Sequence, residues 1–154
     1  MKGFTLIEVI VSVSIALALV GGMIVNYNGY NDRQTLKQTA LTLKNNLRFA
    51  QAKAQSGEKP APACTELIGW AVTFVSGGYA TQASCNPEGL VGDITSVTFP
   101  SGVTASPVPA AIIFRVLSRG TMLVSAETIT LSGFSQTYAL EVSPGGDISD
   151  LGLQ

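Results

Sequence analysis

The sequence predicts an α+β protein in which one long N-terminal helix packs on a small antiparallel β-sheet domain. Two observations carry this prediction. Apolar residues dominate from Phe4 to Val25 and then recur at helical spacing to about Gln55. From Leu67 onward, β-branched and aromatic residues alternate with Gly, Pro and Ser, a pattern typical of strands joined by short turns. The chain of 154 residues leaves room for one modest domain after the helix, and not for a second.

The first element, residues 4–25, is long enough to cross a bilayer as a helix, because about 20 apolar residues cover the hydrocarbon layer. It contains one charged residue, Glu8. A carboxylate at membrane depth costs at least about 2.5 kcal/mol, so Glu8 is predicted to be functional. The preceding Lys2 predicts, by the positive-inside rule, that the rest of the chain lies outside the cytoplasm.

The second element, residues 26–56, is predicted to be the amphipathic half of the same helix. Its apolar residues recur at alternating steps of three and four, which predicts one buried stripe on a helix. The stripe consists of Leu36, Ala40, Leu43, Leu47, Ala50 and Ala54. Gly57 supplies a stop signal, and Pro60 and Pro62 prevent the helix from resuming.

The remaining residues, 57–154, are predicted to form the β-rich domain, with mostly antiparallel pairing because no second helical period separates the strands. The expected strands are residues 68–75, 79–84, 94–99, 112–116, 128–131 and 137–142. A hairpin around Gly77 would place Cys85 opposite Gly69. Residues 100–109, rich in Ser, Pro and Gly, are predicted to be a loop.

The two cysteines, Cys64 and Cys85, are predicted to form a disulfide, because a structural metal site needs four ligands and the chain has no His. Such a bond implies an oxidising compartment. The alternative is a pair of buried free thiols.

Composition argues against catalysis. With no His, the cysteines paired and the carboxylates scattered, no group of residues provides a nucleophile with its base or an acid with its base. We therefore predict a protein that is not an enzyme, with no metal and no cofactor. The formal net charge of −1 gives no overall attraction to nucleic acid.

The N-terminus resembles the processing and assembly signal of type IV pilins and of the related pseudopilins of type II secretion. The matching residues are Gly3-Phe4-Thr5-Leu6-Ile7-Glu8-Val9, preceded by a basic leader and followed by an uninterrupted apolar helix. The resemblance implies a pilin-like fold, a leader peptide at residues 1–3, cleavage between Gly3 and Phe4 by a prepilin peptidase, and N-methylation of Phe4. It also implies that Glu8 acts in filament assembly by meeting the Phe4 ammonium of a neighbouring subunit.

Later segments are similar to the subgroup of H-type minor pseudopilins and FimT-like pilins. These segments are residues 47–54, 70–74, 113–114, 119–120, 128–131, 140–142 and 145–146. The implied partners are other subunits, the prepilin peptidase, an assembly platform in the inner membrane, and the membrane itself. The protein would begin as a single-pass inner-membrane protein and end in a surface pilus or a periplasmic pseudopilus. Nucleic acid is not an expected partner, because Asp147 and Asp150 make the C-terminal tail acidic.

Three alternatives stay open at this stage. The first is that the N-terminus is a secretory signal peptide cut after the stretch from Ala16 to Gly22, although Glu8 would hinder its insertion. It could also be a plain single-pass anchor in which Glu8 is incidental. Finally, the outer domain could be a module that binds DNA or a surface, through residues 100–109 together with Arg115 and Arg119.

Overall fold

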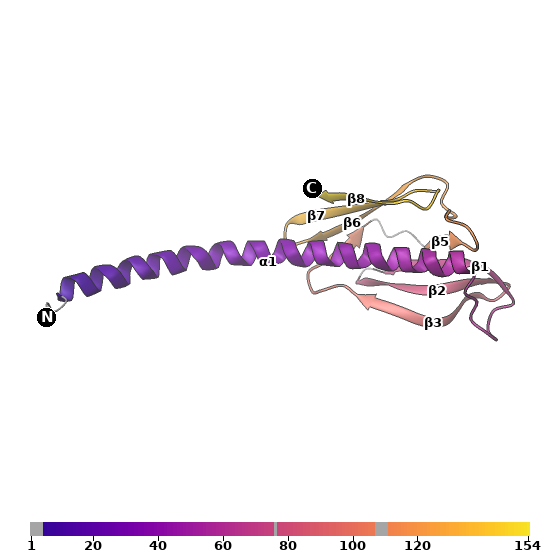
Figure 1. Ribbon diagram of the computed structural model, residues 1–154, viewed down its shortest axis with the longest axis horizontal. Helices are drawn as coiled ribbons and strands as arrows, with labels where there is room; N and C mark the ends of the chain where they lie inside the picture. The colour runs from indigo at the N-terminus through magenta and orange to yellow at the C-terminus, as the bar shows by residue number, and fades with distance from the viewer. Residues whose placement is uncertain (1–4, 76, 107–110) are drawn as a thin grey trace. The chain divides into compact units, whose positions relative to one another are not determined.

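The structure is a computed structural model that describes residues 5–75, 77–106 and 111–154, without the side chains of residues 22–28 and 93. Gly3 and Phe4, the predicted cleavage residues, lie outside this range. The fold is α+β, with helix α1 (Leu6–Ser56) followed by eight strands in the described residues (Figure 1). The chain divides into two compact units, Met1–Gln34 and Thr35–Gln154.

In the second unit the strands form two antiparallel sheets of four strands each. Sheet A has the order β3-β2-β1-β5 and sheet B the order β4-β6-β7-β8. The strands of sheet A are β1 (Glu66–Val75), β2 (Gly78–Asn86), β3 (Gly89–Thr98) and β5 (Ile112–Arg115). Those of sheet B are β4 (Thr104–Ser106), β6 (Glu127–Gly133), β7 (Gln136–Val142) and β8 (Ile148–Leu153).

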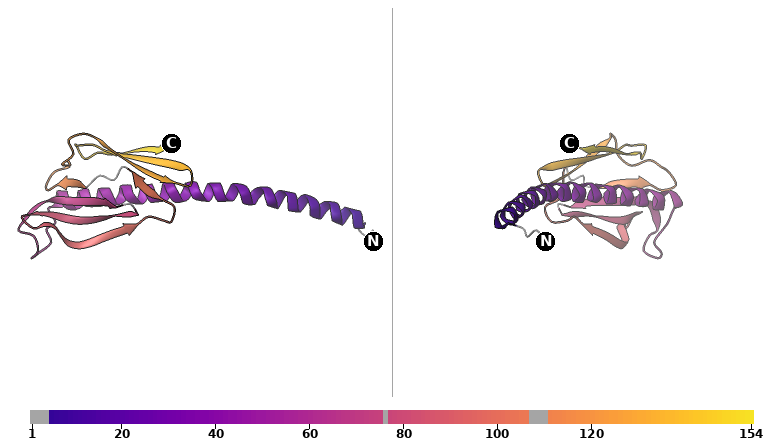
Figure 2. Two further views of the ribbon diagram at one scale, coloured as in Figure 1. Left: turned by 180° about the vertical axis from the view of Figure 1, so that it is seen from behind. Right: turned by 60° about the vertical axis from the view of Figure 1, so that its left-hand side comes forward.

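Residues 35–56 of α1 run between the two sheets, with sheet A on one side and sheet B on the other (Figures 1 and 2). The predicted apolar stripe is confirmed, since all six of its residues are fully buried. They share one core with side chains of both sheets, among them Phe114 of β5 and Leu140 of β7. The helix therefore holds the two sheets together through a single apolar core.

The helix ends where the sequence predicts. Gly57 has a φ of +67°, a left-handed conformation that Gly adopts without strain, and its N–H donates to the Ala54 carbonyl. The N–H of Leu117, from the loop after β5, also donates to the Ala54 carbonyl at 2.9 Å. The Gln51 side-chain amide donates to the carbonyls of Arg119 and Gly146 at 2.9 and 2.7 Å. These bonds fix the last turns of the helix to loops of the domain.

The structure corrects the expectation of one small sheet. Strand β5 pairs with β1, whereas β6 pairs with the short β4, so the chain changes sheet between them. Strand β4 lies in the segment predicted to be a loop, and β8 was not predicted at all. Composition gives little signal for β8, because Ser149, Asp150 and Gly152 have low strand propensity and its pairing with β7 is what holds it.

The register of the first hairpin also differs from the prediction. Val75 pairs with Gly78, and an irregularity between Leu67 and Gly69 shifts the register further, so Cys85 lies opposite Leu67. Only Gly fits at position 78, because a Cβ there would lie 2.2 Å from the Val97 carbonyl oxygen of β3.

Candidate functional site

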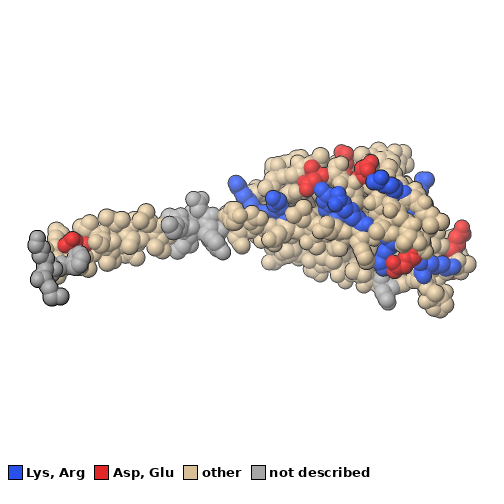
Figure 3. All heavy atoms as spheres, viewed as in Figure 1, with Lys and Arg blue, Asp and Glu red and all other residues tan. Residues whose placement is uncertain are grey.

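The described part of the first unit exposes apolar side chains all around the helix. Every described residue from Thr5 to Gly21 is exposed, and many large apolar side chains show more than half of their surface. These are Leu6, Ile7, Val9, Ile10, Val11, Val13, Ile15, Leu17, Leu19 and Val20. On the face shown in Figure 3, this part is almost free of charge, whereas charges of both signs mingle over the second unit. Uncovered apolar surface on this scale is typical of surfaces that contact another molecule.

Glu8 lies in the first turn of α1, where a negative charge interacts favourably with the helix dipole. The N–H of Glu8 donates to the backbone carbonyl of Thr5 at 3.1 Å, and it lies 3.4 Å from the Thr5 hydroxyl oxygen. Thr5 thus caps the described helix with its side chain, followed three residues later by the acid, in the order of a capping box.

The predicted membrane segment, residues 4–25, extends over residues outside the described set, namely Phe4 and the side chains of residues 22–25. Within the described residues, no helix meets the length and apolarity needed for a membrane span.

In the second unit, Cys64 and Cys85 form a disulfide, as predicted. It joins the segment that follows α1 to the end of β2. The two cysteines are 21 residues apart, and closing a loop of that length is worth about 3 kcal/mol in the chain-entropy model. The bond therefore fixes a segment that has no strand or helix of its own.

Trp70 of β1 holds the start of the same segment, the residues between α1 and β1, through a hydrogen bond. Its indole N–H donates to the Glu58 carbonyl at 3.0 Å, and the Lys53 ammonium lies 4.3 Å from the ring centroid. Lys53 also pairs with the Glu58 carboxylate at 2.8 Å. Trp70 is 7% exposed and belongs to the apolar core.

Of the basic residues considered for nucleic acid, Arg115 is exposed, and Arg119 lies 3.8 Å from the carboxylate of Asp147. Part of the loop assigned with them, residues 107–110, lies outside the described residues.

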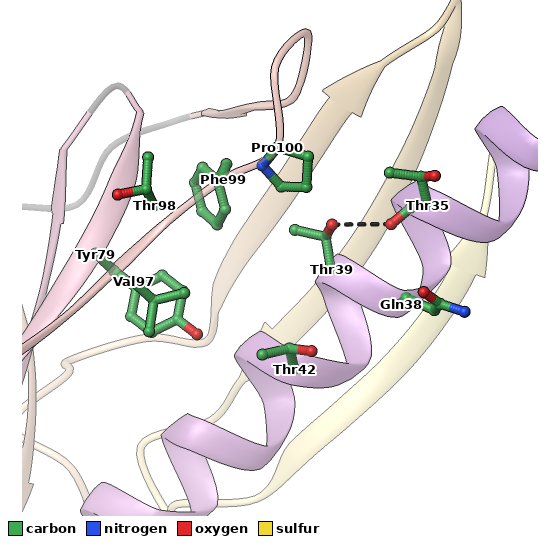
Figure 4. Close-up of a pocket in the computed structure, with 9 residues that line it drawn as sticks. All are labelled: Thr35, Gln38, Thr39, Thr42, Tyr79, Val97, Thr98, Phe99 and Pro100. Carbon is green, nitrogen blue, oxygen red and sulfur yellow. Dashed lines mark hydrogen bonds between the residues drawn. The ribbon is translucent and has the colours of Figure 1, made fainter.

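A pocket that the sequence did not reveal lies between α1 and the β2–β3 edge of sheet A, with a volume of about 260 Å³ (Figure 4). One wall comes from the helix and consists of Thr35, Gln38, Thr39 and Thr42. The other wall comes from β2, β3 and the residues after β3, and consists of Tyr79, Val97, Thr98, Phe99 and Pro100. The available signal was the spacing of the three threonines, which places them along one side of the helix beside the apolar stripe.

Among the described residues, no group of three or more His, Cys, Asp or Glu is arranged to hold a metal ion. The sequence matches no known family model and no curated protein, and the structure matches no solved structure.

Proposed function

We propose that this chain is a structural subunit of a filament of the type IV pilus or type II secretion pseudopilus class. A prepilin peptidase removes residues 1–3, and the new N-terminal Phe4 is methylated. Before assembly the subunit lies in the inner membrane with its domain outside the cytoplasm. An assembly platform then incorporates it into a filament of subunits. The observation that carries the proposal is an exposed apolar helix whose one acid, Glu8, follows Met1-Lys2-Gly3 at pilin spacing.

The physical basis is the pairing of two charges that are costly when buried alone. Cleavage after Gly3 creates an ammonium at Phe4, next to the apolar segment. If Glu8 of one subunit meets that ammonium on its neighbour, neither charge is left unpaired among packed helices. Any other axial stagger leaves both unpaired, so the pair sets the register of assembly.

The exposed apolar surface supports the same proposal, because apolar surface of this extent is unfavourable in water and is stabilised when another molecule packs on it. Lipid covers it before assembly and the helices of other subunits cover it afterwards. The second unit has its own covered core and a disulfide, which suits a domain that folds outside the cytoplasm.

Mass spectrometry of the mature protein, purified from membranes with and without a co-expressed prepilin peptidase, tests the proposal. We expect a chain that begins at methylated Phe4 with the peptidase and at Met1 without it. A Gly3→Leu variant serves as the matched control and should keep Met1 in both samples. A start at Met1 in every sample would indicate a plain anchor, and a start beyond Ala16 would indicate a secretory signal peptide; either result overturns the proposal.

A further inference from the structure

The loop between β5 and β6, residues 116–126, exposes apolar side chains at the end of the second unit where α1 terminates (Figure 1). Leu117 is 77% exposed, Met122 46% and Val124 fully exposed. Single exposed apolar residues are ordinary, whereas several on one short loop are typical of a contact surface. This segment, the apolar loop, is therefore a candidate docking surface.

The apolar loop is held in one shape by its backbone. The N–H groups of Thr121 and Met122 donate to the carbonyls of Pro144 and Ile113, each at 2.9 Å. Leu117 has a φ of +53°, a left-handed conformation that costs free energy in a residue with a Cβ. Strain of this kind is concentrated at functional sites, and a loop that is already fixed loses little conformational entropy when it binds.

The pocket between α1 and sheet A lies at the opposite end of the same unit. Its helix wall begins at Thr35, the first residue of the unit, whereas the apolar loop bonds to Ala54 near the end of α1. At 1.5 Å per residue these two positions are about 28 Å apart along the helix. One unit therefore carries an apolar projection at one end and a pocket at the other.

The pocket has room for one aliphatic side chain. Its volume is about 260 Å³, and none of its nine lining residues carries a charge. On the strand side, Val97 is half-buried and Pro100 is exposed, so both offer apolar surface to a side chain that enters between them and the helix (Figure 4). Such a side chain would leave no charged group without its hydration.

A pair of opposite charges accompanies these two surfaces. Glu127 follows Val124 of the apolar loop by three residues, and Lys37 is next to Gln38 of the pocket wall. Glu127 is half-buried and Lys37 is exposed, and within the part of the chain that the structure describes neither has an ion-pair partner. Three residues span at most about 10 Å, so a loop that brings Val124 to a pocket also brings Glu127 near the Lys37 beside it.

We propose that the apolar loop of one subunit docks on the next copy of this chain, with Val124 in the pocket of that copy and Glu127 beside its Lys37. The two surfaces differ and lie at opposite ends of the unit, so the contact is head-to-tail and repeats along an open filament. The inference rests on the proposed function and adds a contact between domains to the packing of helices. The contact is an addition because a stable interface buries about 1,200 Å² or more, which one loop does not supply.

Cysteine cross-linking in cells that assemble the filament tests the contact. The two cysteines of the chain are joined in the disulfide, so Val124→Cys with Gln38→Cys introduces the only free thiols. Mild oxidation should join these thiols between neighbouring subunits. Denaturing gels without reductant should then show a ladder of dimers, trimers and larger species.

The controls for cross-linking use the same thiols separately. Each single variant should remain monomeric, and cells that produce both single variants should give dimers and nothing larger. Val124→Cys combined with Thr95→Cys should give no ladder, because Thr95 is exposed on β3 outside the pocket.

Exchange of the two charges tests the contact without new thiols. Glu127→Lys alone and Lys37→Glu alone bring like charges together, and we expect each to reduce the yield of sheared filaments by about fivefold, the upper range for an exposed ion pair. The two changes together restore opposite charges and should restore the yield. Arg48→Glu, at an exposed position on the same helix, should not restore the yield of Glu127→Lys.

Wild-type filaments separate this inference from the proposal on which it rests. If the wild type forms no filaments, the proposed function is wrong and the contact with it. If filaments form but the double cysteine variant gives no ladder, or the charge exchange gives no recovery, only the contact is wrong. Dimers of Val124→Cys alone would show that two loops meet each other. Protection of that thiol from a polar maleimide before assembly would assign the loop to the lipid surface, and either result overturns the inference.

Discussion

Gly146 has less room for a side chain than any other glycine in the described residues. Its φ is +86°, and a Cβ built there would lie 1.7 Å from the Arg119 carbonyl oxygen and 2.7 Å from the Gln51 amide nitrogen. We expect Gly146→Ala to reduce the free energy of unfolding by about 3 kcal/mol or more, because it adds a backbone clash to the cost of a left-handed conformation. Denaturant unfolding of the full chain measures this loss.

Gly152→Ala separates the two contributions. Gly152 has a similar φ of +81° but open space within 4 Å of the added Cβ. Gly152→Ala should therefore reduce the free energy of unfolding by only about 1 kcal/mol, which is the cost of backbone strain alone. Equal losses for the two variants would show that the close approach to Arg119 is unimportant.

The interactions of the Asp150 carboxylate stabilise the folded domain, and this stabilisation is lost at acid pH. The Tyr138 hydroxyl donates to its carboxylate at 2.7 Å, and Lys44 lies 3.5 Å away. The hydrogen bond from Tyr138 lowers the pKa of Asp150, with Lys44 adding to the effect and burial opposing it. Burial and the bond to Asp150 raise the pKa of Tyr138 to about 12. Because the folded pKa of Asp150 is depressed, its stabilisation is present above the ordinary Asp pKa of about 3.9 and is lost as pH falls through the folded value.

Tyr138→Phe removes the hydroxyl and should therefore reduce the free energy of unfolding by about 1 kcal/mol at neutral pH. The loss is small because solvent near the carboxylate screens its interactions. The loss should shrink at acid pH, as the carboxyl takes up a proton. Urea titrations at both pH values measure it. The control is Tyr79→Phe, whose partner Asn46 does not titrate, so its cost should be the same at both. A loss for Tyr138→Phe that stays constant with pH would contradict this account.

At the scale of elements, α1 between residues 35 and 56 is the part on which both sheets depend. We expect Leu43→Ala to cost about 2 to 5 kcal/mol, because Leu43 is fully buried in the core common to the two sheets. Leu41→Ala, two residues away on the same helix, should cost under about 1 kcal/mol, since Leu41 is 39% exposed. Denaturant unfolding compares the two, and similar losses would show that the stripe is not the principal support of the sheets.

The elements also show how far sequence reasoning extends. The helical stripe from Leu36 to Ala54 was predictable because a period of 3.6 is a local property of the chain. The division into two sheets was not, because it depends on β5 joining β1 while β4 joins β6 across many residues. The disulfide was predictable by counting cysteines, although the register around Cys85 was not. The pocket escaped prediction because its walls come from elements that no local pattern brings together.

The two units differ in how far they bury their apolar residues. The second unit buries its own in one core, and none of the buried side-chain polar atoms in the described residues lacks a hydrogen-bond partner. The described part of the first unit leaves its apolar side chains exposed. The second unit therefore covers its own apolar residues, whereas the described part of the first unit leaves its apolar side chains open to contact with another molecule.

That difference makes Glu8 the residue on which assembly should depend, and Glu8→Ala the variant that tests it. We expect this variant to be cleaved, methylated and folded, but to yield at least about tenfold fewer filaments, because the Phe4 ammonium of each neighbour would be buried without a counter-ion. Filaments sheared from cells and quantified against total subunit give the measurement. Glu8→Asp keeps the charge on a shorter side chain and should retain part of the yield, and Glu58→Ala, outside the helix, should assemble normally. Filaments of Glu8→Ala in wild-type amounts would show that the carboxylate does not set the stagger between subunits.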